Sequence, residues 1–75
     1  MIDSAEYVGP IDGLKGKKAL VRPDLDTYEL PLDQRKLYAQ FDEIGLRHPA
    51  TGARLGFDWH SFPAADFKIL IRLTA

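Results

Sequence analysis

The sequence predicts an all-β domain, a small five-stranded antiparallel barrel with one 3₁₀ turn near Pro63. Apolar and polar residues alternate over short runs, which is the period of strands with one buried face. Gly and Pro residues interrupt the chain between these runs, so the strands are short and no long helix is expected. Closing so small a sheet on itself removes its exposed edges. An open antiparallel sheet with one short helix is the alternative.

The first two strands are expected on either side of a glycine-rich connection. Residues 2–6 form a lead-in, and Tyr7-Val8 is a short, marginal strand. Residues 9–16 hold three glycines and one proline, a composition typical of turns. Residues 17–22, with the sequence KKALVR, form the second strand, which ends at Pro23 because proline cannot donate to a sheet ladder.

A long acidic connection and a regular strand follow. Residues 24–34 include Pro31 and four acidic residues, so we expect a connecting loop there. A helical turn over residues 32–37, capped by Asp33, is the other interpretation that the sequence leaves open. Residues 37–41 alternate cleanly and predict a half-buried strand.

The C-terminal third holds most of the large aromatic side chains. After a loop at residues 47–54, residues 55–61 alternate as a strand, and residues 67–73 form the last strand. Residues 63–66 are too few for a stable helix and predict the single 3₁₀ turn. The inward phases place four phenylalanines in the core: Phe41, Phe57, Phe62 and Phe67. Four aromatic residues are free to face outward, and for the last two the pattern leaves core or surface open: Tyr7, Tyr28, Tyr38 and Trp59.

The composition predicts one domain over residues 1–75. Ten Lys and Arg against eleven Asp and Glu give a net charge of −1, which disfavours nucleic acid as a partner because domains that bind it usually carry a basic excess. The chain has no cysteine, so neither a disulfide nor a thiolate zinc site is expected. It has no apolar run of membrane-spanning length and no signal-peptide pattern at its start. We therefore expect a cytoplasmic domain without a membrane partner.

Two segments resemble the Src-homology-3-like small barrels. Residues 62–70, FPAADFKIL, resemble the final element of that superfamily, a one-turn 3₁₀ helix before an aromatic-led last strand. Residues 14–21, LKGKKALV, resemble the KOW-type opening of its ribosome- and transcription-associated members, in which a glycine precedes an alternating strand. The resemblance implies a barrel shape. The acidic and aromatic opening and the tandem Trp of the signalling members are absent, so their peptide-gripping role does not transfer to Trp59.

Few residues suggest catalysis. Asp58 and His60 lie two residues apart, a spacing at which a carboxylate can orient a general base, but such a pair is far commoner as solvated surface. His48 would have to join them in a metal site, for which the chain lacks both cysteine and an HxxxH spacing. Phosphate-loop and nucleophile motifs are missing. We expect no enzymatic activity, no metal and no cofactor.

The favoured function is that of a protein-interaction module. The acidic loop at residues 24–35 and the basic loop at residues 45–54 are expected to form a rim whose charge asymmetry orients a protein partner. Exposed Tyr and Trp residues are typical of contact surfaces. The predicted partner-binding residues are Tyr28, Arg35, Tyr38 and Trp59. Homo-oligomerisation through an edge strand would be binding of the same kind.

The alternative function is that of a nucleic-acid or ribosome-associated accessory domain. Four basic residues cluster in the sequence: Lys15, Lys17, Lys18 and Arg22. Beside an exposed aromatic ring they would suit single-stranded RNA, whose bases stack on such rings. The simpler interpretation, which we favour, is that Lys17 and Lys18 flank a strand and keep its edge from pairing.

Overall fold

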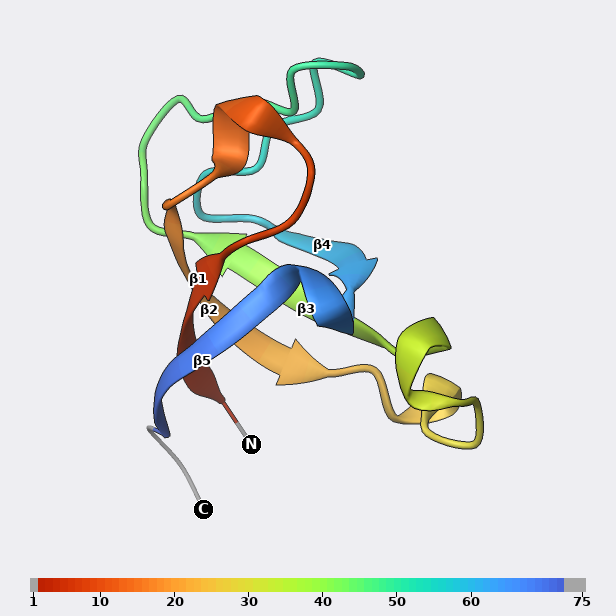
Figure 1. Cartoon of the computed structure of the whole chain (residues 1–75). Coiled ribbons are helices and arrows are strands. Elements are labelled where there is room, and N and C mark those ends of the chain that lie inside the picture. Colours follow the sequence, from red (N-terminus) through yellow and green to blue (C-terminus); the bar gives the residue numbers. More distant parts are fainter. Residues whose placement is uncertain (1, 73–75) are drawn as a thin grey trace.

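The computed structural model describes residues 2–72 and contains one antiparallel sheet with short 3₁₀ turns between its strands (Figure 1). The strands are β1 (Asp3–Tyr7), β2 (Lys18–Pro23), β3 (Lys36–Phe41), β4 (Trp59–Pro63) and β5 (Phe67–Arg72). The 3₁₀ helices are η1 (Asp12–Leu14), η2 (Leu25–Thr27), η3 (Leu32–Gln34) and η4 (Ala64–Asp66). All the helical turns within residues 2–72 are too short to cross a bilayer.

The strand order is β4-β3-β2-β1-β5, so the two edge strands are consecutive in the chain. Only the three residues of η4 separate them, which forces the two edges together at that end and curls the sheet (Figure 1). The all-β class and the 3₁₀ turn beside Pro63 are confirmed, but residues 2–72 contain four such turns and not the single one predicted. The ladders within residues 2–72 do not join β4 to β5, so they show a five-stranded sheet and not a closed barrel.

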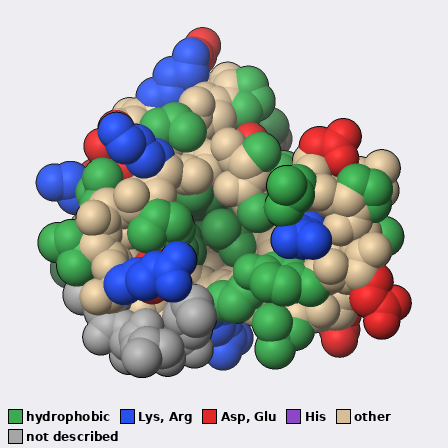
Figure 2. Space-filling view, turned by 60° about the horizontal axis from the view of Figure 1, so that its bottom comes forward, with side chains coloured by type: hydrophobic (Ala, Val, Ile, Leu, Met, Phe, Trp, Pro, Cys, Tyr) green, Lys and Arg blue, Asp and Glu red, His purple; other side chains and the backbone are tan. Residues whose placement is uncertain are grey.

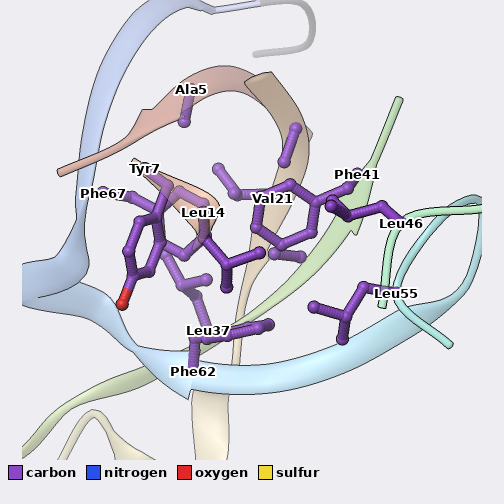
Figure 3. Close-up of a cluster of buried hydrophobic side chains, with 12 residues drawn as sticks. Ala5, Tyr7, Leu14, Val21, Leu37, Phe41, Leu46, Leu55, Phe62 and Phe67 are labelled. Carbon is purple, nitrogen blue, oxygen red and sulfur yellow. The ribbon is translucent and has the colours of Figure 1, made fainter. Parts of the chain in front are cut away.

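The curled sheet has an inner face that holds the core. Burial alternates along β1, β2 and β3, as expected for strands with one buried side. Four rings pack together there with centroids 5.3–6.4 Å apart, at tilted or edge-to-face angles that aromatic pairs favour. They belong to Tyr7, Phe41, Phe62 and Phe67. Leu14, Leu46 and Leu55 cover this cluster from the connections (Figure 3).

The first strand begins earlier than predicted. Residues 3–6 are not a lead-in but pair with β2 on one side and β5 on the other. Tyr7, which the sequence left free to face outward, is fully buried. Its hydroxyl donates to Asp66 Oδ2 at 3.3 Å and accepts a hydrogen bond from the Ile11 N–H. The inward positions of β1 before Tyr7 are polar Asp3 and small Ala5, so the strand shows no alternation of large apolar residues.

The predicted strand at residues 55–61 is wrong in its first half. β4 starts only at Trp59, because the chain turns at Phe57, whose φ is +58°. The side chain of Phe57 is 49% exposed, so this predicted core residue is on the surface. The turn shifts the alternation, so that Phe62 points to the core and Trp59 lies on the opposite, outer face.

The last strand also differs from its pattern. Phe67 is buried as predicted, but Ile69 and Ile71 are exposed. β5 is an edge strand, and its register against β1 shifts between Ser4 and Ala5, so a regular alternation does not produce a buried face there. Leu73, the last residue of the predicted strand, lies outside the described residues. Of the two interpretations of residues 32–37, the structure has a short 3₁₀ turn, η3, followed by β3.

Candidate interaction surface

Three residues of the outer face form a cation–π stack, which we call the arginine stack: Arg22, Tyr38 and Trp59. The guanidinium carbon of Arg22 lies 5.3 Å from the ring centroid of Tyr38 and 4.7 Å from that of Trp59. The sheet register explains the contact. Arg22 of β2 pairs with Tyr38 of β3, and Trp59 of β4 pairs with Gln40, two residues from Tyr38 on the same face of β3. Both distances are within the range of a favourable cation–π interaction.

The arginine stack is partly open to solvent. Arg22 is exposed, while Tyr38 and Trp59 are half-buried. Within residues 2–72 the acidic side chains in ion pairs bind Lys15, Lys17 and His60, and none pairs with Arg22. The rings of Tyr38 and Trp59 are therefore the main electrostatic partners of the Arg22 guanidinium.

A hollow adjoins the arginine stack where β2 leads into the acidic loop. Its volume is about 350 Å³, and Arg22, Tyr38, Leu25 and Asp26 are among its lining residues. Leu25 is 69% exposed although it is apolar. An apolar side chain and a carboxylate thus lie next to an arginine with aromatic neighbours.

Tyr28 and Arg35 form a second pair within the acidic loop. The Arg35 guanidinium carbon lies 5.0 Å from the Tyr28 ring centroid, and its Nε donates to the Leu30 carbonyl at 3.1 Å. Asp24 caps η2 by accepting from the Asp26 N–H, as is usual for a residue before a helical turn. These contacts connect the two ends of the loop to its middle, and Tyr28 is 46% exposed on it.

The two predicted loops do not form one rim. The acidic loop precedes β3, and the basic loop follows it, so the two lie at opposite ends of this strand (Figure 1). The arginine stack and the acidic loop are neighbours, whereas residues 45–54 lie at the far end. The four predicted partner-binding residues thus fall into two groups, Tyr38 with Trp59 and Tyr28 with Arg35.

The four predicted nucleic-acid residues are separated in the structure. Lys15 pairs with Asp12 at 3.3 Å, and Lys17 pairs with Glu43 at 2.7 Å. Lys18 is exposed on the same phase of β2 as Arg22. Two of the four positive charges therefore have acidic partners, and a contiguous basic patch does not form.

The histidines make no metal cluster within residues 2–72. His60 Nε2 lies 3.5 Å from Asp58 Oδ2, so the predicted neighbours do meet. They do not share a strand surface, because Asp58 precedes β4. His48 Nδ1 accepts from the Ala50 N–H at 3.1 Å and so is used within its own loop.

Sequence reasoning missed two residues of interest, Asp3 and Arg22 as a stacking cation. Asp3 is a buried carboxyl group at the start of β1, in a segment expected as a lead-in.

Comparison of the chain with models of protein families, with curated proteins and with solved structures finds no match. The geometry of the surface is therefore the basis on which its function is argued.

Proposed function

We propose that this chain is a non-catalytic protein-interaction module whose binding surface consists of the arginine stack and the adjoining acidic loop. The observation that supports it is the contact of Arg22 with both Tyr38 and Trp59 on a partly exposed sheet face. Residues that dominate binding energy in protein interfaces are enriched in Trp, Tyr and Arg. The stack offers all three, already ordered, so that little side-chain entropy is lost on binding.

The acidic loop supplies apolar area and charge beside the stack. Leu25, Leu30 and Leu32 are exposed on it together with Tyr28. Burial of such side chains contributes roughly 25 cal/mol per Å² of apolar surface before the costs of association. Four carboxylates on the same loop would orient a partner with a basic contact surface: Asp24, Asp26, Glu29 and Asp33.

The test is a pull-down from cell extract after nuclease treatment, with wild type and single variants. Trp59→Ala, Tyr38→Ala and Tyr28→Ala should each weaken retention of a discrete protein by ~10-fold or more, the usual cost of losing an aromatic anchor. Ile44→Ala is the matched control, because Ile44 is 87% exposed and follows the far end of β3. If all variants retain the partner protein equally, the proposed surface is refuted. If the bait retains a second copy of this chain, the result indicates homo-oligomerisation.

A nucleic-acid role is the second candidate, favoured by one feature of the outer face. Lys18 and Arg22 lie on the same phase of β2, and Arg22 contacts the rings of Tyr38 and Trp59. Binding of a labelled single-stranded oligonucleotide would then fall steeply with salt and be lost in Lys18→Glu. Binding that persists in Lys18→Glu would count against this candidate.

We also propose that the curled sheet is a Src-homology-3-like barrel. The strand order β4-β3-β2-β1-β5 and the one-turn η4 between the edge strands support it. So does the contact between the two edges, where the Phe62 and Phe67 rings lie 5.8 Å apart. Slow hydrogen exchange of backbone amides in both edge strands is expected of a closed barrel.

A further inference from the structure

A cavity of about 240 Å³ opens at the end of the sheet where β1 starts and β2 ends. Val21, Leu37, Phe67 and Ile69 are among its apolar lining residues, and the basic residues Arg22, Lys36 and Arg72 line it too. Figure 2 views this end of the molecule and shows a hollow with hydrophobic side chains in it. The buried apolar part of the cavity lies on the inner side of the sheet, and Arg22 of the arginine stack lines it as well, so the two features adjoin.

Asp3 lines this cavity. Among residues 2–72 it is the only polar or charged residue that is buried. It is only 7% exposed, and its Oδ1 is fully enclosed. No protein group within residues 2–72 donates a hydrogen bond to that oxygen. A buried carboxyl oxygen without a donor is costly to the fold, and native proteins keep few of them. The residue therefore calls for an explanation other than stability.

The basic residues around the cavity leave Asp3 unpaired. Arg72 is its partner across the β1–β5 ladder, but it is exposed and forms no ion pair with Asp3 in the described residues. Lys36 lies on the opposite phase of β3 from buried Leu37. The guanidinium of Arg22 is engaged by the rings of the outer face. Arg72 is thus the cation placed to compete for Asp3.

We propose that this cavity binds an alkylammonium group, with the cation at the Asp3 carboxyl group and the carbon chain against Val21, Leu37 and Phe67. A charge-assisted hydrogen bond to a buried carboxylate is about twice as strong as a neutral one, and the apolar wall suits a methylene chain. The ammonium group would donate to the Asp3 carboxyl group at the cavity wall, and the broad terminal torsion of Asp3 lets the carboxyl plane turn toward the ligand. One carboxylate in an apolar wall is too few oxygen ligands for Ca²⁺ or Mg²⁺.

This site adjoins the proposed protein-binding surface, because Arg22 and Tyr28 line the cavity, but it includes neither Tyr38 nor Trp59. The alkylammonium group has two possible sources, a free amine or the side chain of a lysine on a partner protein. Both would place the same chemistry in the cavity. They differ in what is attached at the mouth, where Tyr28 and Arg72 line the opening.

The test uses n-butylammonium chloride as the probe and backbone amide NMR shifts of the wild-type chain as the readout. We expect saturable shifts at residues 3, 21, 37 and 67, with millimolar affinity typical of so small a ligand. 1-Butanol, which has the same chain and no charge, should bind at least ~10-fold more weakly. Equal binding of the alcohol, or no saturable shift with the amine, overturns the proposal.

Two variants have opposite expected effects. Asp3→Asn should weaken n-butylammonium binding by ~10-fold or more, while Arg72→Gln should strengthen it a few-fold by removing the competing cation. Asp58→Asn, an exposed carboxylate outside the cavity, is the matched control and should change nothing. If Asp3→Asn does not fold, the comparison of amine with alcohol and the gain in Arg72→Gln still decide. Weaker binding in Arg72→Gln would contradict the proposal.

Nα-acetyl-lysine amide distinguishes the two sources, because its side-chain ammonium is its only charge. Binding equal to that of n-butylammonium supports a lysine of a partner protein. Binding of the free amine alone supports a small-molecule ligand. Loss of partner retention in Trp59→Ala with unchanged amine binding would separate this site from the proposed protein surface.

Discussion

Gly56 is the residue whose small size decides how the chain enters β4. It is buried, and a Cβ atom at this position would overlap the carbonyl oxygen of Glu43. Its N–H donates to the Leu46 carbonyl at 3.2 Å, and it forms a bridge with Phe41. Phe57 follows in the left-handed region, with its N–H bonded to the Phe41 carbonyl at 2.9 Å. This tight passage places the turn that shifts the alternation before β4.

We expect Gly56→Ala to lower the free energy of unfolding by ~1–3 kcal/mol or more, because the backbone of Glu43 must move to admit the methyl group. Urea unfolding followed by circular dichroism measures this. Gly45→Ala is the control, since Gly45 has a φ of +80° but open space around it. That variant should lose only ~1 kcal/mol, the cost of a left-handed alanine. Equal losses would show that the contact with Glu43 is unimportant.

At the scale of elements, β4 presents two faces with different roles. Phe62 points inward, where its ring lies 5.7 Å from Phe41 and 6.1 Å from Tyr7. Trp59 points outward and contacts the guanidinium of Arg22. The same strand therefore contributes one ring to the core and one to the candidate surface.

Truncation of the two rings should separate stability from binding. Phe62→Ala should cost ~3–5 kcal/mol, enough to unfold a domain of this size. Trp59→Ala should cost less, ~1–2 kcal/mol, because its ring is only half-buried. Thermal unfolding of both variants checks the difference, with Phe62→Leu as a milder core change. A Trp59→Ala chain that unfolds at room temperature would place this ring in the core.

At the scale of the whole molecule, Tyr7 joins the first strand to the turn between the sheet edges. Its hydroxyl donates to Asp66 in η4, 59 residues further along the chain. Gly9 packs against both groups, and a Cβ atom there would clash with Asp66 and with the Tyr7 hydroxyl. Burial raises the pKa of Tyr7 above its ordinary value. The hydrogen bond from the Ile11 N–H lowers this pKa, and the negative charge of Asp66 raises it.

Because the pKa of Tyr7 is raised, the free energy of unfolding should decrease as the pH becomes alkaline. The unfolded chain releases the Tyr7 proton near pH 10, before the folded chain does. The stability contributed by neutral Tyr7 is thus complete below pH 10 and is lost as pH rises toward the higher folded pKa. Urea unfolding at pH 9, 10 and 11 should show a steeper decline for wild type than for Tyr7→Phe, which keeps Tyr28 and Tyr38. Parallel declines would contradict the link.

The sequence by itself determined the class of the fold, because short-range alternation and chain breakers are local. The strands at 18–23 and 36–41 follow from the period of their apolar residues, and the turn after Pro63 follows from proline and a short spacing. It also named the surface aromatics Tyr28, Tyr38 and Trp59 as candidates. Their identity as amphipathic rings needs no knowledge of the fold.

Only the tertiary structure decided which residues meet. Arg22 stacks on two rings because the β2–β3–β4 register brings three strands into line, and register depends on pairings far apart in the sequence. Tyr7 is buried because β5 and η4 return to it from the end of the chain. The sequence pattern did not predict which residues of β4 face the core, because the left-handed residue Phe57 adds a turn before this strand. Such a turn exchanges the two faces of the strand. Local pattern sets which side chains alternate, and long-range pairing sets the face on which they lie.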